Sequence, residues 1–238
     1  ADDLARHFTV DGVRHYVLSE MPYASDGSIT YESLIGRYNA DLANNLGNLV
    51  KRTVDMTGKY FGGVIQVPSA AEPIDDELRA AVRDAVSRSR EQMDSYHVAD
   101  ASETVFGLFR RANKYIDETT PWVLAKDESR RERLGTVLYN LLETIRIGAV
   151  LLEPFMPDTS KRILAQLATD EQTVEFGALK AGDTLTTAVK FYSNTGNELV
   201  YSAGSELPTV IYATTNDKVA TVDNDGKITV VGAGRAEI

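Results

Sequence analysis

Hydrophobic residues in the first two-thirds of the chain recur every three or four positions. Residues at this spacing lie on one face of a helix. The first such series consists of Ile35, Tyr38, Leu42, Leu46, Leu49, Thr53, Met56 and Tyr60. Similar series run through residues 75–93, 102–117 and 131–152. The pattern predicts an antiparallel α-helical bundle.

Prolines mark the predicted ends of these helices. Pro73, Pro121, Pro154 and Pro157 stand where the periodic series begin or stop. Proline is favoured in the first turn of a helix and disfavoured in its interior. The stretch PDTSKRILAQLA, residues 157–168, predicts a last short helix with Asp158 as its N-terminal cap.

Near residue 170 the period of the pattern changes from three or four to two. The segments TLTTAVKFY, TVIYATT, KVATVD, KITVV and RAEI are rich in β-branched residues and tyrosine, with turn residues between them. The DNDG between KVATV and KITVV is typical of a hairpin turn, because Asp-Gly readily adopts positive φ angles. We therefore expect two domains, with a small all-β sandwich after the helical bundle.

Composition limits the classes of function open to the chain. It has 238 residues, no cysteine and a formal net charge of −10. The absence of cysteine excludes disulfides, thiolate metal sites and cysteine nucleophiles. The acidic balance argues against an indiscriminate polyanion binder but permits a local basic face. Because no apolar run has the length of a membrane helix, we expect no membrane contact.

The sequence contains none of the common motifs for metal binding, nucleotide binding or catalysis. His7, His15 and His97 lack metal-ligand spacing. A calcium loop around DNDGK fails because Thr221 would take the first ligand position and Gly232 the place of the bidentate glutamate. GAGRAE precedes a strand pattern rather than a helix, and no GxxxxGK[ST] loop occurs. We expect no catalytic residue, no metal site and no cofactor in this chain.

One polar constellation stands out in the first long helix. Asn44, Asn48 and Arg52 are spaced four residues apart and so share one face, roughly opposite Leu42, Leu46 and Leu49. Asparagine is a mediocre helix former, and two of them beside Gly47 require a reason. On the pattern alone a solvated polar face is the favoured interpretation, and the alternative is a set of donors and acceptors for a ligand.

Trp122 is the single tryptophan of the chain and follows Pro121. A large aromatic residue at the start of a helix is often a core anchor. Indole, amide and guanidinium groups are also the side chains that stack on and read unpaired bases. The residues alone leave both interpretations open.

Three separated segments of the helical half resemble the C-terminal region of bacterial methionyl-tRNA synthetases. They are MPYASDGSITYESLIGRYNADLANNLGNLVKRT, ANKYIDETTPWVLAKD and LYNLLETIRIGAVLLEPFMPDTSKRI, and the leading ADDLARHFTVDGVRHYVL is similar to the segment that follows the family's KMSKS-type loop. The resemblance covers about residues 1–168. It implies a remnant of the stem-contact fold at residues 1–30 and a class Ia helical-bundle anticodon-binding domain at 31–168. It also implies that Trp122 stacks on the anticodon and that Asn44, Asn48 and Arg52 hydrogen-bond its bases.

The β half resembles a different family. TTNDKVATVDNDGKITVVGAGRAEI and KAGDTLTTAVKF are similar to strands of bacterial immunoglobulin-like group 2 modules. This resemblance implies an immunoglobulin-like sandwich at residues 184–238, truncated at its C-terminus, after a segment at 169–183 that is a linker or the start of the module.

The first resemblance implies a non-catalytic part of a methionine–tRNA ligase that recognises the CAU anticodon of methionine tRNA, and the second implies an appended immunoglobulin-like module of unknown role. No HIGH-like or KMSKS-like motif is present, so the ATP and methionine sites belong to a catalytic domain, which is an expected partner, and the chain alone should be inactive. A synthetase part implies a cytoplasmic location. The alternative is a structural or adhesion protein of a cell surface or phage particle, in which the immunoglobulin-like module binds an unknown partner.

Overall fold

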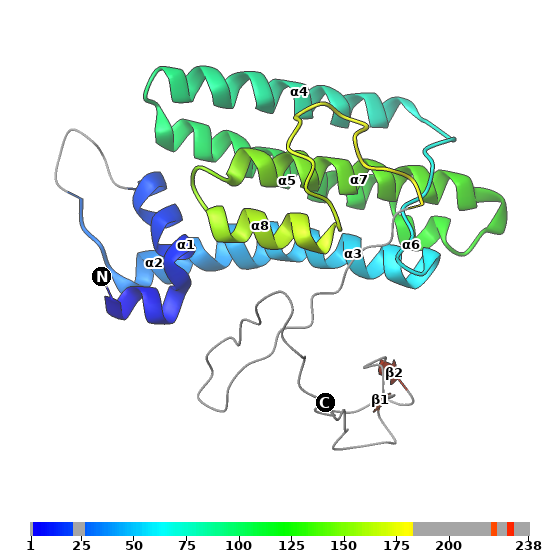
Figure 1. Cartoon of the computed structure of the whole chain (residues 1–238), viewed down its shortest axis with the longest axis horizontal. Coiled ribbons are helices and arrows are strands. Elements are labelled where there is room, and N and C mark those ends of the chain that lie inside the picture. The colour runs from blue at the N-terminus through cyan, green and yellow to red at the C-terminus, as the bar shows by residue number, and fades with distance from the viewer. Residues whose placement is uncertain (1, 21–26, 183–219, 223–227, 231–238) are drawn as a thin grey trace, which may run out of the picture. The chain divides into compact units, whose positions relative to one another are not determined.

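The computed structural model describes residues 2–20, 27–182, 220–222 and 228–230. The chain divides into two compact units, Ala1–Ala188 and Val189–Ile238. In the described residues the first unit is helical, as the periodicity predicts (Figure 1). Its elements are α1 (Asp2–Glu20), α2 (Tyr31–Arg37), the π-helix η1 (Tyr38–Gly47), α3 (Asn48–Phe61), α4 (Pro73–Asp94), α5 (Val98–Thr119), α6 (Pro121–Leu124), the 3₁₀ turn η2 (Glu128–Arg130), α7 (Arg131–Leu152) and α8 (Pro157–Gln166).

Helix α7 is the central helix of this unit. It packs against α3, α4, α5 and α8, and nearly all of its residues are buried. The stretch Glu128–Leu152 is long and apolar enough to cross a membrane, but 89% of its most apolar window is buried inside the unit. A core helix of a bundle has this composition because neighbouring helices surround it.

Prolines begin three of the helices at the predicted places. Pro73, Pro121 and Pro157 occupy the first turns of α4, α6 and α8, respectively. The predicted cap of the last helix was wrong, because α8 begins at Pro157 and leaves Asp158 inside the first turn without a capping bond. The backbone N–H of Thr159 instead donates to the Asp11 carboxylate of α1, at 2.6 Å. A distant carboxylate therefore satisfies this helix N-terminus.

The buried face predicted for the first long helix was wrong at the helix's N-terminal end. The periodic series predicts a buried Ile35, yet Ile35 is 45% exposed and Leu34 is buried instead. The cause is η1, whose i→i+5 hydrogen bonds make each turn wider than an α-helical turn. Residues before the π segment are thereby displaced by one position from a uniform α-helical phase.

A segment without helix or strand, residues 169–182, packs along the bundle. We call it the C-terminal strap. The guanidinium of Arg146 in α7 donates to the carbonyl oxygens of Thr173 and Glu175, at 2.5 and 2.7 Å. Glu143, one turn earlier, accepts hydrogen bonds from the backbone N–H groups of Gly177 and Leu179 and pairs with Arg146 at 2.9 Å. The segment predicted as a linker or the start of the β module is thus bound to the helical unit in its described part.

A second buried ionic cluster joins α4 to α7. Arg133 donates to both oxygens of Asp75, at 2.6 and 2.8 Å, and the Tyr115 hydroxyl donates to one of them. Burial acts to raise the pKa of Asp75, but the hydrogen bonds from Arg133 and Tyr115 outweigh it and lower the pKa below its ordinary value. Asp75 is therefore a carboxylate at neutral pH.

The second unit is described only at two strands. β1 (Ala220–Val222) pairs with β2 (Ile228–Val230) in antiparallel register, with Thr221 opposite Thr229. This is the pairing expected on either side of the DNDG turn. The turn itself and the rest of the predicted sandwich at 184–238 lie outside the described residues.

Removing the cation of the buried α7 pair should destabilise the helical unit strongly. In Arg146→Met the Glu143 carboxylate stays buried without its partner, which costs about 3–5 kcal/mol. Urea unfolding followed by far-UV circular dichroism measures the loss. Lys51→Met is the control, because it breaks an exposed pair with Asp55 worth about 1 kcal/mol or less. Equal effects of the two substitutions would contradict the structural role of Arg146.

Helices α5 and α7 approach each other closely at Gly148. A Cβ atom at this position would overlap the ring of Phe109, whereas one at Gly58 of α3 would meet nothing within 4 Å. Gly148→Ala should therefore cost about 1–3 kcal/mol through overpacking, and Gly58→Ala should stabilise its helix by about 0.5–1 kcal/mol. Thermal melts of the two variants give the comparison, and a neutral Gly148→Ala would contradict the close packing.

Candidate nucleic-acid interface

The structure brings the four predicted site residues to one side of the helical unit. Asn44 lies in η1, while Asn48 and Arg52 lie in α3; the two asparagines are exposed and Arg52 is half-buried. Trp122 lies in α6 and its side chain is 40% exposed. The indole is therefore not a core side chain.

A groove separates η1 and α3 from α5. We call it the α3–α5 groove; its volume is about 450 Å³, and it is lined by Ala40, Asn44, Asn45, Asn48, Arg52, Arg110, Asn113, Lys114 and Asp117. The three predicted polar residues form one wall, and side chains of α5 form the other. The groove is open to solvent and rich in amide and cationic groups.

Arg52 connects this groove to the indole. Its Nη2 atom lies 3.3 Å from Oδ1 of Asp117 on α5. Its guanidinium carbon lies 5.8 Å from the centroid of the Trp122 ring, within the range of a cation–π contact. The guanidinium therefore stands between the amide row and the exposed aromatic ring.

The backbone at the α5–α6 junction turns Trp122 outward. Thr120 has φ 43° and ψ 62°, in the left-handed region that β-branched residues rarely adopt. Its carbonyl oxygen accepts hydrogen bonds from Val123 and Leu124, at 2.8 and 3.3 Å. This turn buries Pro121 and leaves Trp122 exposed. Strained residues of this kind cluster at functional sites.

Two amides fix the floor of the groove. Asn113 Nδ2 donates to the backbone oxygen and the side-chain oxygen of Asn45, at 3.1 and 3.0 Å. Asn45 Nδ2 donates in turn to the carbonyl oxygen of Phe106, at 3.2 Å. The π-helix thus directs Asn45 into the structure and leaves Asn44, its neighbour, facing solvent. The two walls are held together by these bonds.

Asp41 anchors the N-terminal end of the same wall. Its carboxylate contacts His15 Nε2 at 3.0 Å and Arg37 Nε at 2.7 Å, and Arg110 Nη1 lies 4.0 Å away. Burial acts to raise the pKa of Asp41, but the hydrogen bond from His15 and the charges of Arg37 and Arg110 outweigh it and lower the pKa. Asp41 therefore remains ionised at neutral pH and links α1 to the groove through Arg110.

Sequence reasoning missed the α5 wall. Arg110, Asn113, Lys114 and Asp117 are spaced three, one and three residues apart, which places them on one polar face of a helix. The stretch FRRANKYID therefore contained enough information to predict this polar face. It was missed because only the apolar residues of the stretch were used, to predict the helix.

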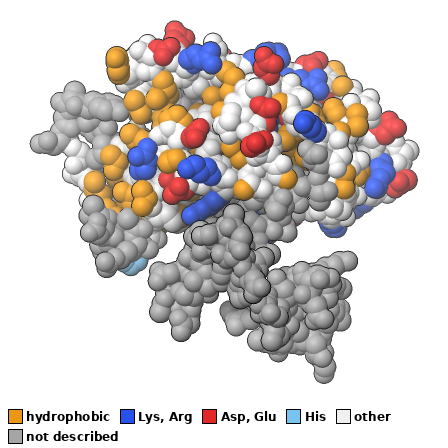
Figure 2. All heavy atoms as spheres, viewed as in Figure 1, with side chains coloured by type: hydrophobic (Ala, Val, Ile, Leu, Met, Phe, Trp, Pro, Cys, Tyr) orange, Lys and Arg blue, Asp and Glu red, His pale blue; other side chains and the backbone are white. Residues whose placement is uncertain are grey.

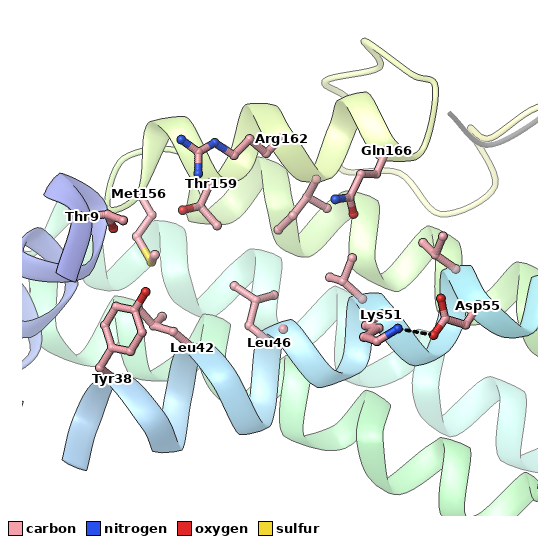
Figure 3. A pocket seen from close by; sticks show the side chains of 14 residues that line it. Thr9, Tyr38, Leu42, Leu46, Lys51, Asp55, Met156, Thr159, Arg162 and Gln166 are labelled. Carbon is pink, nitrogen blue, oxygen red and sulfur yellow. Dashed lines mark hydrogen bonds and ion pairs between the residues drawn. The ribbon is translucent and has the colours of Figure 1, made fainter. Parts of the chain in front are cut away.

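A second hollow lies between α8 and the η1–α3 helix and has a volume of about 560 Å³. Figure 3 shows Tyr38, Leu42 and Leu46 facing Met156 and Thr159, with the Lys51–Asp55 pair at one end. None of the four predicted site residues lines it. Its walls are largely aliphatic and offer no row of amides.

The charges on the surface are mixed. Figure 2 shows one face of the molecule, on which acidic and basic side chains are interspersed. The described residues hold no group of three or more side chains placed to bind a metal ion. Of the three histidines, His15 is buried against Asp41 and His97 precedes α5.

Comparison with known proteins identifies the helical unit. The model of the anticodon-binding domain of methionyl tRNA ligase matches residues 67–199, and the model of class I tRNA synthetases (M) matches residues 1–54. The methionine–tRNA ligase of Clostridium perfringens is 50% identical over 184 residues, which are 76% of this chain and 28% of that protein. The Bacillus subtilis ligase is 43% identical over 185 residues, which are 77% and 27% of the two chains.

Solved structures agree with the sequence matches. The apo form of Mycobacterium tuberculosis methionyl-tRNA synthetase superposes with a TM-score of 0.73 and 34% identity, over 79% of this chain and 39% of that one. The chain spans less than a third of the length of the curated relatives it matches. Since the anticodon-domain model covers more than half of its residues, this chain belongs to the family of methionyl-tRNA ligase anticodon-binding domains.

Proposed function

We propose that this chain binds methionine tRNA by reading its CAU anticodon with the α3–α5 groove and Trp122. One observation carries the proposal: Arg52 joins the exposed amides of Asn44 and Asn48 to an exposed indole 5.8 Å from its guanidinium carbon. Sequence-specific recognition of RNA targets unpaired loop bases, which are stacked on aromatic rings and hydrogen-bonded at their edges. The site supplies both kinds of group side by side.

The two kinds of group have different roles. Trp122 provides a flat ring on which a base can stack whatever its identity. The two asparagine amides and the Arg52 guanidinium provide directional donors and acceptors, which favour particular base edges. Stacking therefore supplies affinity, and the amide row supplies the preference for CAU.

The wider role follows from the family. We infer that the chain acts as the non-catalytic part of a methionine–tRNA ligase in the cytoplasm and that its partner in aminoacylation is the catalytic domain of such an enzyme. ATP and methionine would bind to that domain, so this chain would hold no cofactor and have no activity alone. Residues 184–238 would form an immunoglobulin-like module with its own partner, supported by the antiparallel pair β1–β2.

Trp122→Ala should weaken binding to every anticodon alike. Loss of one stacking contact costs about 1–3 kcal/mol, which is roughly one to two decades in Kd. Fluorescence-polarisation titration with labelled anticodon stem–loops, CAU and one altered sequence, measures both affinities. Val123→Ala, at the next residue, which is 51% exposed against 40% for Trp122, is the control. If Trp122→Ala binds normally but melts much earlier, the residue is structural.

Arg52→Gln should reduce the preference for CAU more than the affinity for the altered loop. Directional contacts to a base edge discriminate by about 1–3 kcal/mol. The control is Lys51→Gln, which removes the same charge from the neighbouring residue, whose side chain lines the hollow on the other side of α3. The measured quantity is the ratio of the two Kd values. If Arg52→Gln leaves the ratio of the two Kd values unchanged, as Lys51→Gln should, base reading by Arg52 is contradicted.

A further inference from the structure

The two walls of the α3–α5 groove differ in chemistry. The η1–α3 wall presents Asn44, Asn48 and the Arg52 head group, which is drawn across to Asp117. The α5 wall presents two further cations, Arg110 and Lys114, one helical turn apart. The first wall adjoins the indole through Arg52.

The lining of the groove holds more cations than carboxylates, although the chain as a whole is acidic. Its lining holds three cations, Arg52, Arg110 and Lys114, against one carboxylate, Asp117, while the whole chain carries a formal net charge of −10. Lysine and arginine that neutralise phosphates supply the salt-dependent part of nucleic-acid affinity. The three cations of the groove are therefore candidates for such phosphate contacts.

Arg110 and Lys114 are exposed cations, and each lies beside an acid: Glu103 for Arg110, and Glu118, at 3.4 Å, for Lys114. The Arg110 side chain is 47% exposed, and the Lys114 side chain 69% exposed. The Glu103 carboxylate accepts a hydrogen bond from Nη2 of Arg110, and the buried Asp41 carboxylate lies 4.0 Å from Nη1. These acids orient the guanidinium at the end of the groove, and a guanidinium has five N–H donors, so others remain for a ligand. Lys114 lies about 6 Å further along the helix axis.

We propose that Arg110 and Lys114 bind backbone phosphates of the RNA strand whose bases the opposite wall reads. This inference rests on the proposed function and assigns a different role to each wall of the groove. Residues of α5 contact the RNA backbone and fix the position of the strand, while residues of η1 and α3 contact base edges. Phosphate contacts position a nucleic acid and carry no sequence information, whereas base contacts specify it. An acidic peptide would also suit the cations, but it would give no use to the stacking ring and the amide row.

The test is the salt dependence of binding by the full chain. Affinities for the CAU stem–loop and an altered stem–loop are measured over a series of potassium chloride concentrations, for wild type, Lys114→Gln, Arg110→Gln and the double variant. The control double variant is Arg83→Gln with Arg90→Gln, which removes the same charge from exposed positions on α4, beside a different hollow. Arg110→Lys keeps the charge at the groove.

The double variant should reduce the slope of log K against log salt by about 1.4, since each single-strand phosphate contact contributes roughly 0.7. Each single variant should give about half of this reduction, and Arg110→Lys none. The ratio of CAU to altered affinities should stay at its wild-type value. The α4 control should leave the slope nearly unchanged.

Two results would overturn the inference alone: a wild-type slope in the double variant, or a loss of the CAU preference in that variant. If the α4 control lowers the slope as much as the groove variant, only bulk charge matters and the inference also fails. Should wild type bind CAU and altered loops equally, or bind neither, the proposed function fails and this inference falls with it. Lys114→Gln, at an exposed helical position, keeps the test valid if Arg110→Gln fails to fold.

Discussion

The groove depends on one amide, the side chain of Asn113. Its nitrogen donates to three oxygens, two on Asn45 and one on Phe109, at 3.0 to 3.2 Å. The two bonds to Asn45 tie α5 to the π-helix η1, while the bond to Phe109 lies within α5 and orients the amide. Binding sites are most precise when their side chains stand on rigid elements held by a surrounding layer of hydrogen bonds. Here the supporting bonds lie directly beneath the groove.

Buried charges hold the surrounding framework. Glu143 and Arg146 are fully buried in the central helix and bind the C-terminal strap through its backbone. Asp75 and Arg133 join α4 to α7, and Asp41 joins α1 to η1 through His15. Each pair is completed by further hydrogen bonds, which is the condition under which a buried ion pair is tolerated. The polar groups of the groove lie outside these buried clusters, at the surface.

Sequence reasoning predicted the helices and placed Asn44, Asn48 and Arg52 on one face, because both follow from local periodicity. Trp122 was added to this group only through the resemblance to methionyl-tRNA synthetases. Prolines at 73, 121 and 157 begin helices as predicted. What it missed depends on contacts between distant segments. Asp11 accepts a hydrogen bond from the N-terminus of α8, and buried charges in α7 bind the C-terminal strap. Residues of α5 form the second wall of the groove. The π segment shifted Leu34 into the core in place of Ile35, because a uniform helical spacing cannot anticipate a wider turn.

Anticodon reading by the isolated chain is tested most directly by equilibrium titration of the wild-type chain with intact methionine tRNA. The comparison is with the same tRNA carrying one altered anticodon base, at fixed salt. Loss of a good directional contact corresponds to about 1–3 kcal/mol, so the altered tRNA should bind roughly five- to 150-fold more weakly. Equal Kd values for the two tRNAs would contradict the account.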